Sequence, residues 1–242
     1  MIQETTAKTI ITRTKIPVAK YVINPYIGCT FGCLYCYARF IGPFKYTNSR
    51  WGRDVWVKVN SAELVERELP RTAGDFFLSS ICDPYQHVEK KYGLTRKIIE
   101  TLTSHFREVH LMTKSNLILR DIDLLKNLSV TLTITTDREE VRKVLEPGAP
   151  SIEERIQTLR KLKESGIDVS VFIGPVLVMD AENFARMLSR YVEKVVLDGL
   201  NYHRQVYSVY KRYGWTEWLT KEKFMEVVER FEKVFGKGQV IY

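Results

Sequence analysis

Three of the chain's four cysteines lie within eight residues, at Cys29, Cys33 and Cys36. Their spacing is C-x3-C-x2-C, and Gly28 and Gly32 lie among them, where they allow the backbone to curl. Three thiolates on one tight loop are able to hold three corners of a cubane iron–sulfur cluster. The fourth iron then lacks a protein ligand, and an open position is typical of a metal site that binds a small molecule. The pattern therefore predicts a catalytic cluster.

Other uses of closely spaced cysteines are less consistent with this sequence. A structural zinc site has four ligands and usually two C-x2-C pairs. This chain has one such pair, so the fourth ligand would be Cys82 or one of four scattered histidines. A zinc-stabilised nucleic-acid-binding module and a purely electron-transferring iron–sulfur protein remain as alternatives. A disulfide framework is disfavoured, because no apolar signal segment opens the chain and a reducing cytoplasmic location is expected.

The composition is that of a globular protein. The chain has 242 residues, of which 45% are hydrophobic and 27% are charged, and this suits one α/β domain with a sizeable core. No apolar run approaches the roughly 20 residues of a membrane-spanning helix, so no membrane partner is expected. The net charge of +8 permits a polyanionic partner, but composition does not show that the charge is clustered.

Short apolar runs alternate with amphipathic segments along the chain, which is typical of β/α proteins. The predicted strands are 22–23, 76–79, 109–113, 130–135, 169–173 and 194–197. The predicted helices are 61–69, 94–106, 116–126, 151–165, 181–191 and 221–235. Strands joined by helical crossovers pair in parallel. The pattern predicts an α/β fold, a partial (β/α)6 TIM-like barrel open on one side. Residues 1–200 form this barrel, and residues 201–242 form a helical extension packed on it within one structural domain.

Local signals mark some of these helix ends. Ser61 is a plausible N-cap of the helix that follows it. Ser151 and Glu154 have the spacing of a capping box, and Gly166 is the expected C-cap of the same helix. The cysteine loop follows the strand at 22–23. Active sites of such barrels lie at the carboxyl ends of the strands, so the loop occupies the expected end.

The cysteine loop resembles that of the radical S-adenosylmethionine (SAM) enzymes. The resemblance implies a 4Fe–4S cluster whose open iron chelates the amino and carboxylate groups of SAM. It also implies that an electron from the cluster cleaves SAM to methionine and a 5′-deoxyadenosyl radical. A donor such as flavodoxin or ferredoxin would supply that electron. Tyr35 and Tyr37 flank Cys36, where aromatic rings shield the cluster, and Tyr37 is expected to touch the cofactor.

Beyond the loop, the chain resembles the spore photoproduct lyase-like branch of these enzymes over about residues 24–180. The resemblance rests on short patches that occur in the same order. These patches are Asn24-Pro25-Tyr26, Cys36-Tyr37-Ala38-Arg39, Asp83-Pro84-Tyr85-Gln86, Leu94-Thr95-Arg96, Thr113-Lys114-Ser115, Arg120-Asp121, Glu146-Pro147 and Gly174-Pro175.

The resemblance also implies which residues contact SAM, and each of them follows a predicted strand. Asp83 is expected to accept hydrogen bonds from the SAM ammonium, and Lys114 to pair with its carboxylate. Thr135 offers a hydroxyl to the ribose, and the backbone around Gly174 receives the adenine. A lone Asp or Lys at a strand end is usually a capped turn or a solvated charge, so these assignments depend on the cluster.

Cys82 has two interpretations. In the lyase, a cysteine near the corresponding aspartate donates a hydrogen atom to the product radical. The position where that cysteine is expected here, three residues before Asp83, is Ser80, and Cys82 lies two residues further on. Cys82 is a hydrogen donor if its side chain faces the SAM pocket and a small buried hydrophobe if it faces the core. This departure argues against repair of the spore thymine dimer.

The segment 201–218 is dense in aromatic and basic residues. Aromatic faces stack on bases while Arg and Lys contact phosphates, so the segment is able to grip an unpaired nucleotide. Alternatively it is a helix that covers the open side of the barrel, with its Tyr and Trp buried. The expected function is radical repair or modification of DNA or RNA. Radical modification of a protein or small molecule is the alternative.

Overall fold

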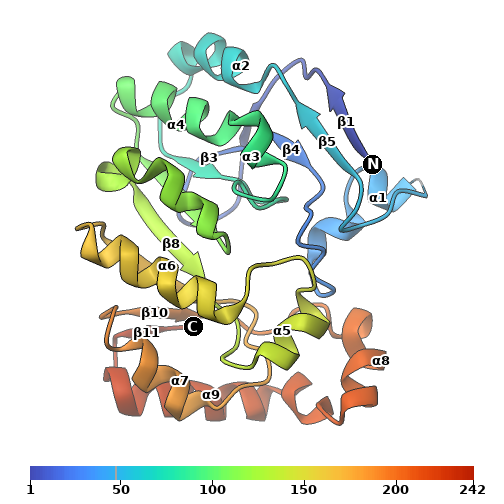
Figure 1. Cartoon of the computed structure of the whole chain (residues 1–242), viewed down its shortest axis with the longest axis vertical. Helices are drawn as coiled ribbons and strands as arrows, with labels where there is room; N and C mark the ends of the chain where they lie inside the picture. The colour runs from blue at the N-terminus through green and yellow to red at the C-terminus, as the bar shows by residue number, and fades with distance from the viewer. Residues whose placement is uncertain (47) are drawn as a thin grey trace.

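The computed structural model describes residues 1–46 and 48–242, and its centre is one mostly parallel sheet (Figure 1). In order across the sheet its strands are β2 (Ile11–Arg13), β3 (Tyr21–Ile23), β6 (Phe76–Leu78), β7 (Val109–Thr113), β8 (Ser129–Thr133), β9 (Val169–Ile173), β10 (Val195–Leu197) and β11 (Val240–Ile241). The pairs from β3 to β11 are parallel, and β2 is antiparallel to β3. Within the described residues β2 and β11 do not pair, so the barrel is open, as predicted.

The six predicted strands are β3, β6, β7, β8, β9 and β10, and all are confirmed. In β7 and β9 buried side chains alternate with half-buried ones, whereas all three residues of β6 are buried. A parallel sheet covered on both faces requires such apolar runs. β8 ends at Thr133, two residues earlier than expected, which matters for the position of Thr135.

The helices follow the predicted order. They are η1 (Tyr37–Phe40), α1 (Pro43–Tyr46), α2 (Ser61–Glu68), η2 (Leu69–Arg71), α3 (Glu89–Tyr92), α4 (Leu94–Ser104), η3 (Asn116–Asn127), α5 (Glu139–Leu145), α6 (Ile152–Glu164), α7 (Ala181–Leu188), α8 (His203–Tyr213), η4 (Thr216–Leu219) and α9 (Lys221–Phe235). The predicted helix 116–126 is a 3-10 helix with non-helical backbone angles at Asp121. None of the helices in the described ranges is both long and apolar enough to cross a bilayer.

The predicted capping box of α6 is confirmed, but the predicted caps at Gly166 and Ser61 are each off by one residue. Ser151 Oγ accepts a hydrogen bond from the Glu154 amide at 3.2 Å, and the Glu154 carboxylate accepts one from the Ser151 amide at 2.8 Å. Gly166, with φ +73°, directly follows the C-cap of that helix. Ser61 is not an N-cap, because it is the first residue of α2 and its hydroxyl donates to the Lys58 carbonyl at 2.5 Å.

A second, smaller sheet was not predicted. Its strands, in spatial order, are β1 (Ile2–Thr5), β5 (Val55–Lys58) and β4 (Tyr26–Ile27). β1 and β5 lie side by side next to the N-terminus in Figure 1. β4 pairs with β5 and leads into the cysteine loop, so this small sheet fixes the start of the loop.

The C-terminal segment packs on the barrel and also extends its sheet. Figure 1 shows α9 alongside α7 in the lower half, with α8 at one end of that half. The Phe184 and Phe231 rings of α7 and α9 meet edge to face, with centroids 6.1 Å apart. β11 then adds a parallel strand to β10. The division of the chain at residue 200 stays a prediction.

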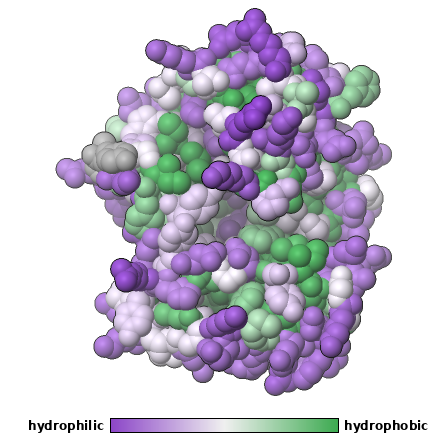
Figure 2. Space-filling view, turned by 180° about the vertical axis from the view of Figure 1, so that it is seen from behind, coloured by the Kyte–Doolittle hydropathy of each residue, from purple (hydrophilic) through white to green (hydrophobic). Residues whose placement is uncertain are grey.

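The molecule exposes hydrophobic side chains on one face. Figure 2 shows this face, viewed from the side opposite to that of Figure 1. Hydrophobic residues gather around a recess near its middle, and hydrophilic residues lie along its margins.

The apolar interior lies between the sheet and its helices, and includes Ile23, Leu78 and Val171, each at most 1% exposed. The barrel is therefore well packed around the strands whose ends carry the candidate site.

Candidate cofactor-binding site

A cavity of about 320 Å³ lies where the loops that follow the parallel strands meet the cysteine loop. Eight of the nine residues predicted for the site line it. They are Cys29, Cys33, Cys36, Tyr37, Cys82, Asp83, Lys114 and Gly174. These residues come from segments far apart in the sequence, so the fold brings the predicted side chains together. Their individual roles stay predictions.

Thr135 is the ninth predicted residue, and the structure places it away from the cavity. Its side chain is fully buried, and its hydroxyl donates a hydrogen bond to Glu146 Oε1 at 2.9 Å. Because β8 ends at Thr133, that residue is the one that lines the cavity from this strand. The Thr133 hydroxyl is therefore better placed than the Thr135 hydroxyl to contact a ligand in the cavity.

The cysteine loop needs glycine at its turns. Gly28 and Gly32 have φ values of +91° and +61°, which L side chains rarely adopt. A Cβ atom on Gly28 would also lie 2.5 Å from the Asp54 carbonyl oxygen. The two glycines therefore allow the curled path that the sequence predicted for the thiols.

Gln86 connects the cysteine loop to the segment after β6. Its side chain is fully buried, and its Nε2 donates to the Gly28 carbonyl at 3.0 Å. Its Oε1 accepts from the Thr30 amide at 2.9 Å. One amide group thus pairs with the backbone on both sides of Cys29. Gln86 belongs to a patch that carried the family resemblance, but its position along the chain does not indicate this role.

The segment 145–148 supports the other half of the loop. The Leu34 amide donates to the Leu145 carbonyl at 2.9 Å, and the Gly148 amide donates to the Phe31 carbonyl at 2.9 Å. A Cβ atom on Gly148 would lie only 2.2 Å from the Thr30 carbonyl oxygen. The two backbones therefore approach closely only because residue 148 is glycine.

The three thiols fit a cluster with one protein ligand on each of three irons. Burial raises the pKa of Cys29, Cys33 and Cys36, that of Cys33 to about 12. The thiolate forms therefore need nearby positive charge, which bound iron provides. In residues 1–46 and 48–242, no three His, Cys, Asp or Glu side chains converge on a single-ion site. A cubane does not require such convergence, because each thiolate binds a different iron.

A buried charged cluster centred on Glu146 lies behind the cavity wall. Arg155 Nη2 is 2.5 Å from Glu146 Oε2, and both side chains are fully buried. Lys114 Nζ lies 3.8 Å from Glu146 Oε1, and the Tyr35 hydroxyl donates to that same oxygen. Burial would raise the pKa of Glu146, but Arg155 and Lys114 outweigh this effect and hold it at about 2.

The Glu146 cluster fixes two residues of the cavity lining, Lys114 and Tyr35. The ammonium of Lys114 also lies 6.0 Å from the Tyr35 ring centroid, within the range of a cation–π contact. Sequence reasoning identified the Glu146-Pro147 patch but assigned it no role. The spacing along the chain could not show that its partners come from positions 35, 114, 135 and 155.

Asp83 joins the end of β6 to the end of β7. Its carboxylate accepts hydrogen bonds from the Thr113 hydroxyl at 2.6 Å and from the Lys114 amide at 2.8 Å. A third comes from the Tyr85 amide at 2.9 Å. Burial raises the pKa of Asp83, and these three donors oppose that rise. Asp83 therefore holds the backbone of Lys114 in place, whether or not it also contacts SAM.

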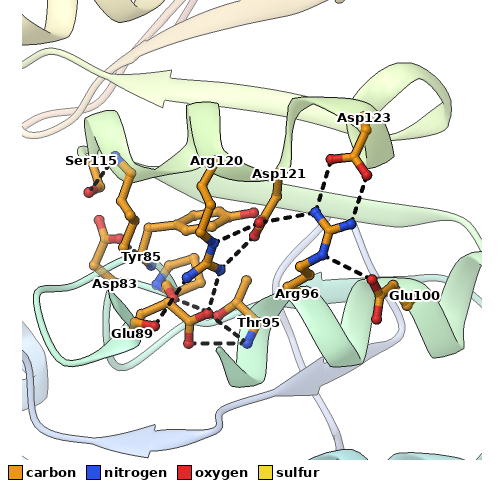
Figure 3. A network of polar contacts seen from close by, with 12 residues as sticks. Asp83, Tyr85, Glu89, Thr95, Arg96, Glu100, Ser115, Arg120, Asp121 and Asp123 are labelled. Atoms are coloured by element: carbon orange, nitrogen blue, oxygen red, sulfur yellow. Dashed lines mark hydrogen bonds and ion pairs between the residues drawn. The ribbon is translucent and has the colours of Figure 1, made fainter. Parts of the chain in front are cut away.

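A second polar network lies behind Asp83, as Figure 3 shows. Arg120 Nη2 is 2.8 Å from Glu89 Oε1 and 2.7 Å from Asp121 Oδ2, and both carboxylates are fully buried. Arg96 Nη1 lies 3.3 Å from Asp121 Oδ1 and connects α4 to η3. Glu89 also accepts from the Thr95 amide at 3.1 Å. The resemblance patches at 94–96 and 120–121 therefore support the strand-end loops and do not line the cavity.

Cys82 contacts both of the environments considered for it. Its side chain is half-buried, lines the cavity and packs against apolar residues that include Tyr26 and Val57. Burial raises the pKa of its thiol to about 12. Nearby Ser79 has φ +83°, which is unusual for a residue other than glycine. The unusual backbone at Ser79 lies at the end of β6, on the same wall of the cavity.

Two exposed tyrosines meet at the cavity. Tyr37 and Tyr202 both line it, and their rings stack with centroids 6.5 Å apart and an interplanar angle of 26°. The Tyr37 hydroxyl donates to the Ser80 carbonyl. Tyr202 immediately precedes α8, so the C-terminal segment forms part of the cavity. Sequence reasoning left the role of segment 201–218 open.

Comparisons with known proteins agree with this arrangement. The family model of the radical SAM superfamily matches residues 23–190. The chain is 43% identical over 174 residues to an uncharacterised protein of Methanocaldococcus jannaschii, a match that covers 71% of this chain and 66% of that protein. It is 25% identical over 188 residues to spore photoproduct lyase of Clostridium acetobutylicum, across 74% of this chain and 52% of the lyase.

The fold is also similar to that of a solved structure. The structure of spore photoproduct lyase complexed with dinucleoside spore photoproduct superposes with a TM-score of 0.71. That match covers 99% of this chain and 81% of the lyase chain, at 16% sequence identity. The chain spans about two thirds of the length of its archaeal relative and about half of the clostridial lyase. At 16% sequence identity the similarity to this solved structure is evidence for the fold alone.

Proposed function

Because the chain belongs to the radical SAM superfamily, we propose that it cleaves SAM reductively at a 4Fe–4S cluster held by Cys29, Cys33 and Cys36. When bound, the cluster and SAM supply a 5′-deoxyadenosyl radical, formed together with methionine when one electron breaks the sulfur–C5′ bond. The observation that supports this proposal best is that the three thiols share one cavity with Asp83, Lys114 and Gly174. An electron donor such as flavodoxin or ferredoxin would reduce the cluster.

Each residue of the cavity has a distinct part in this proposal. Lys114 presents an ammonium to the SAM carboxylate, while Glu146 and Asp83 fix its side chain and backbone. Tyr35 shields the cluster, because its hydroxyl is held by Glu146 at the cavity wall. Gly174 leaves backbone accessible to the adenine, and a Cβ atom there would lie 2.1 Å from the Phe172 ring.

We propose a nucleic acid as the substrate. The net charge of +8 favours a polyanion, and the lyase to which the chain is similar has been solved with a dinucleoside spore photoproduct. A base inside a duplex would have to be flipped out at a cost of a few kcal/mol, so an unpaired or damaged nucleotide is favoured. Radical modification of a protein or small molecule is the second candidate.

The test of the chemistry is SAM cleavage by anaerobically reconstituted protein. We expect about four irons per chain and release of 5′-deoxyadenosine from SAM after reduction with dithionite. Replacing Cys29, Cys33 and Cys36 by alanine should abolish both, whereas the Cys82→Ala variant should keep its cluster. A protein that binds one tight zinc and never cleaves SAM would contradict the proposal. A cluster whose spectrum does not respond to SAM would indicate electron transfer alone.

Lys114→Ala should weaken SAM binding while the cluster still assembles. A charge-assisted hydrogen bond contributes roughly 1.5–3 kcal/mol, which corresponds to about a 10- to 150-fold rise in Kd. Equilibrium binding of SAM to the reconstituted protein measures this change, and iron content confirms assembly. The exposed Lys90 supplies the control, Lys90→Ala. Asp83→Ala should also weaken SAM binding, because it releases the Lys114 backbone. Unchanged affinity in both the Lys114 and the Asp83 variant would refute these assignments.

A further inference from the structure

Helix α8 presents an exposed basic and aromatic stripe. Arg204, Tyr207 and Lys211 are three and four residues apart, so they are neighbours along one face of the helix. All three are exposed, and Tyr207 is 53% exposed. Arg212 is a further exposed base on an adjacent side of the helix, and α8 contains no Asp or Glu. The stripe is therefore uniformly positive and includes a flat apolar surface.

The charge of this stripe is not neutralised by the protein. In the part of the chain that the structure describes, no carboxylate lies within 4.0 Å of Arg204, Lys211 or Arg212. The neighbouring helix α9 differs, because its Lys223 lies 2.9 Å from Glu226 and its Arg230 lies 3.6 Å from Glu182. The α8 bases are thus available to an external polyanion.

Packing does not account for the exposed tyrosines. Val206 and Tyr210, both fully buried, fix α8 to the protein. Tyr202 and Tyr207 are about half exposed, at 48% and 53%. Both interpretations of segment 201–218 therefore describe part of it. The buried face covers the protein, as a packing helix would, and the exposed face is available to a nucleotide.

The stripe leads to the cavity. Tyr202, just before the first turn of α8, lines the cavity and stacks against Tyr37. The helix has 11 residues, and at about 1.5 Å per residue it extends roughly 16 Å from that point. We call the following residues the α8 rim: Tyr37, Tyr202, Arg204, Tyr207, Lys211 and Arg212.

We propose that the α8 rim binds a single-stranded nucleic acid whose unpaired base enters the cavity beside Tyr202. Tyr207 and Tyr202 stack on bases, while Arg204, Lys211 and Arg212 contact the phosphates. A single strand fits better than a duplex, because only unstacked bases expose their faces to aromatic side chains. This inference rests on the proposed function, since it assigns the substrate class and the path by which the substrate reaches the same cavity.

Fluorescence anisotropy with the reconstituted protein tests the rim. The probes are a labelled single-stranded DNA, a single-stranded RNA, a duplex of the same sequence and polyglutamate, each at two salt concentrations. We expect at least one single strand to bind more tightly than the duplex and polyglutamate. Tyr202→Ala combined with Tyr207→Ala should weaken that binding at least tenfold. Circular dichroism and iron content check that the variants fold and carry the cluster.

A charge-matched pair of triple variants separates the rim from net charge. Replacing Arg204, Lys211 and Arg212 by Gln should lower the slope of log K against log salt by about two, because each phosphate contact contributes about 0.7 for a single strand. The control replaces the exposed Lys126, Lys161 and Lys163 by Gln, which removes the same charge elsewhere. Equal losses in the two triple variants would show that net charge alone drives binding.

The remaining outcomes separate this inference from the proposed function. If polyglutamate binds as tightly as the single strands, or no nucleic acid binds at low salt, the rim proposal is overturned even though the wild-type protein cleaves SAM. If the wild-type protein binds single strands through the rim but never cleaves SAM, the proposed function fails and the rim remains. Unaltered single-strand binding in the tyrosine double variant would also overturn the rim.

Discussion

The cysteine loop lines the cavity, and helix α8 begins directly after Tyr202, which lines it too. The protein holds the loop and the helix in different ways. The loop is fixed by directional bonds, from Gln86 on one side and from the backbone of residues 145 and 148 on the other. Helix α8 is fixed by apolar burial of Val206 and Tyr210. In the described ranges, the buried Tyr210 Oη and Gln205 Oε1 have no hydrogen-bond partner.

This difference matches the parts proposed for the two sides. Hydrogen bonds fix both distance and direction, and three thiolates that share one cluster need defined positions. Apolar contact is non-directional, so a helix held mainly by it is able to shift slightly without breaking a specific bond. The cysteine-loop side of the cavity is thus geometrically determined, and the α8 side tolerates adjustment.

The largest effect is expected for the Glu146 cluster behind the loop. Glu146→Gln leaves the fully buried Arg155 without its charged partner. Breaking a buried ion pair in this way costs about 3–5 kcal/mol, which denaturant unfolding will measure. The control is Glu164→Gln, which removes an exposed partner of Arg160 and should change stability little. If the two variants have the same free energy of unfolding, the cysteine-loop side of the cavity is not held more rigidly than the α8 side.

The pH dependence of stability should report the same cluster. The pKa of Glu146 is about 2 in the folded protein, below its ordinary value of 4.5. Its stabilising contribution is therefore complete above about pH 4.5 and is lost as the pH falls towards 2. The difference corresponds to about 3 kcal/mol. Comparing unfolding of wild-type and Glu146→Gln protein across this range isolates the contribution, because the variant lacks it. Parallel curves would contradict the assignment.

Gln86→Leu should have a smaller effect, confined to the loop. The substitution leaves the Gly28 carbonyl and the Thr30 amide without their partner. A buried group left without a partner costs roughly 1–3 kcal/mol. We expect lower stability and less iron bound per chain on reconstitution. Normal iron content would show that the loop does not depend on this bridge.

Tyr210→Phe should have the smallest effect. It removes a buried hydroxyl that has no partner among the described residues and keeps the ring that packs α8. Removing an unsatisfied polar group is neutral or slightly stabilising. The free energy of unfolding should therefore change by no more than about 1 kcal/mol. A clear loss of stability would reveal a specific bond on the α8 side and weaken the contrast with the loop.

The sequence predicted the barrel and most of the cavity for physical reasons that can be traced. Runs such as 109–113 and 169–173 carry the alternation of a sheet. The family resemblance singled out Asp83 and Lys114, and the carboxyl ends of the parallel strands bring them to the same cavity as the cysteines. Thr135 was misplaced because the pattern continues after the hydrogen bonding of β8 ends at Thr133. Such boundaries are the least certain part of a pattern.

What the sequence missed depends on contacts between distant segments. Glu146 looks like any carboxylate at the end of a short helix until Arg155 and Tyr35 are placed beside it. β1, β4 and β5 are two to four residues long, and no predicted helical crossover sets them apart in the sequence. The exposed stripe on α8 required knowledge of which face Val206 and Tyr210 bury.

The bonds that shape the cysteine loop also set an order of events during synthesis. The three cysteines lie near the N-terminus, but the groups that hold their backbone are at residues 86, 145 and 148. Translation at about 5–20 residues per second separates the appearance of Cys36 and Gly148 by roughly 6–20 seconds. The nascent chain therefore presents its thiols well before it has a shaped loop. We therefore expect the cluster to be delivered only after residue 148 has emerged from the ribosome.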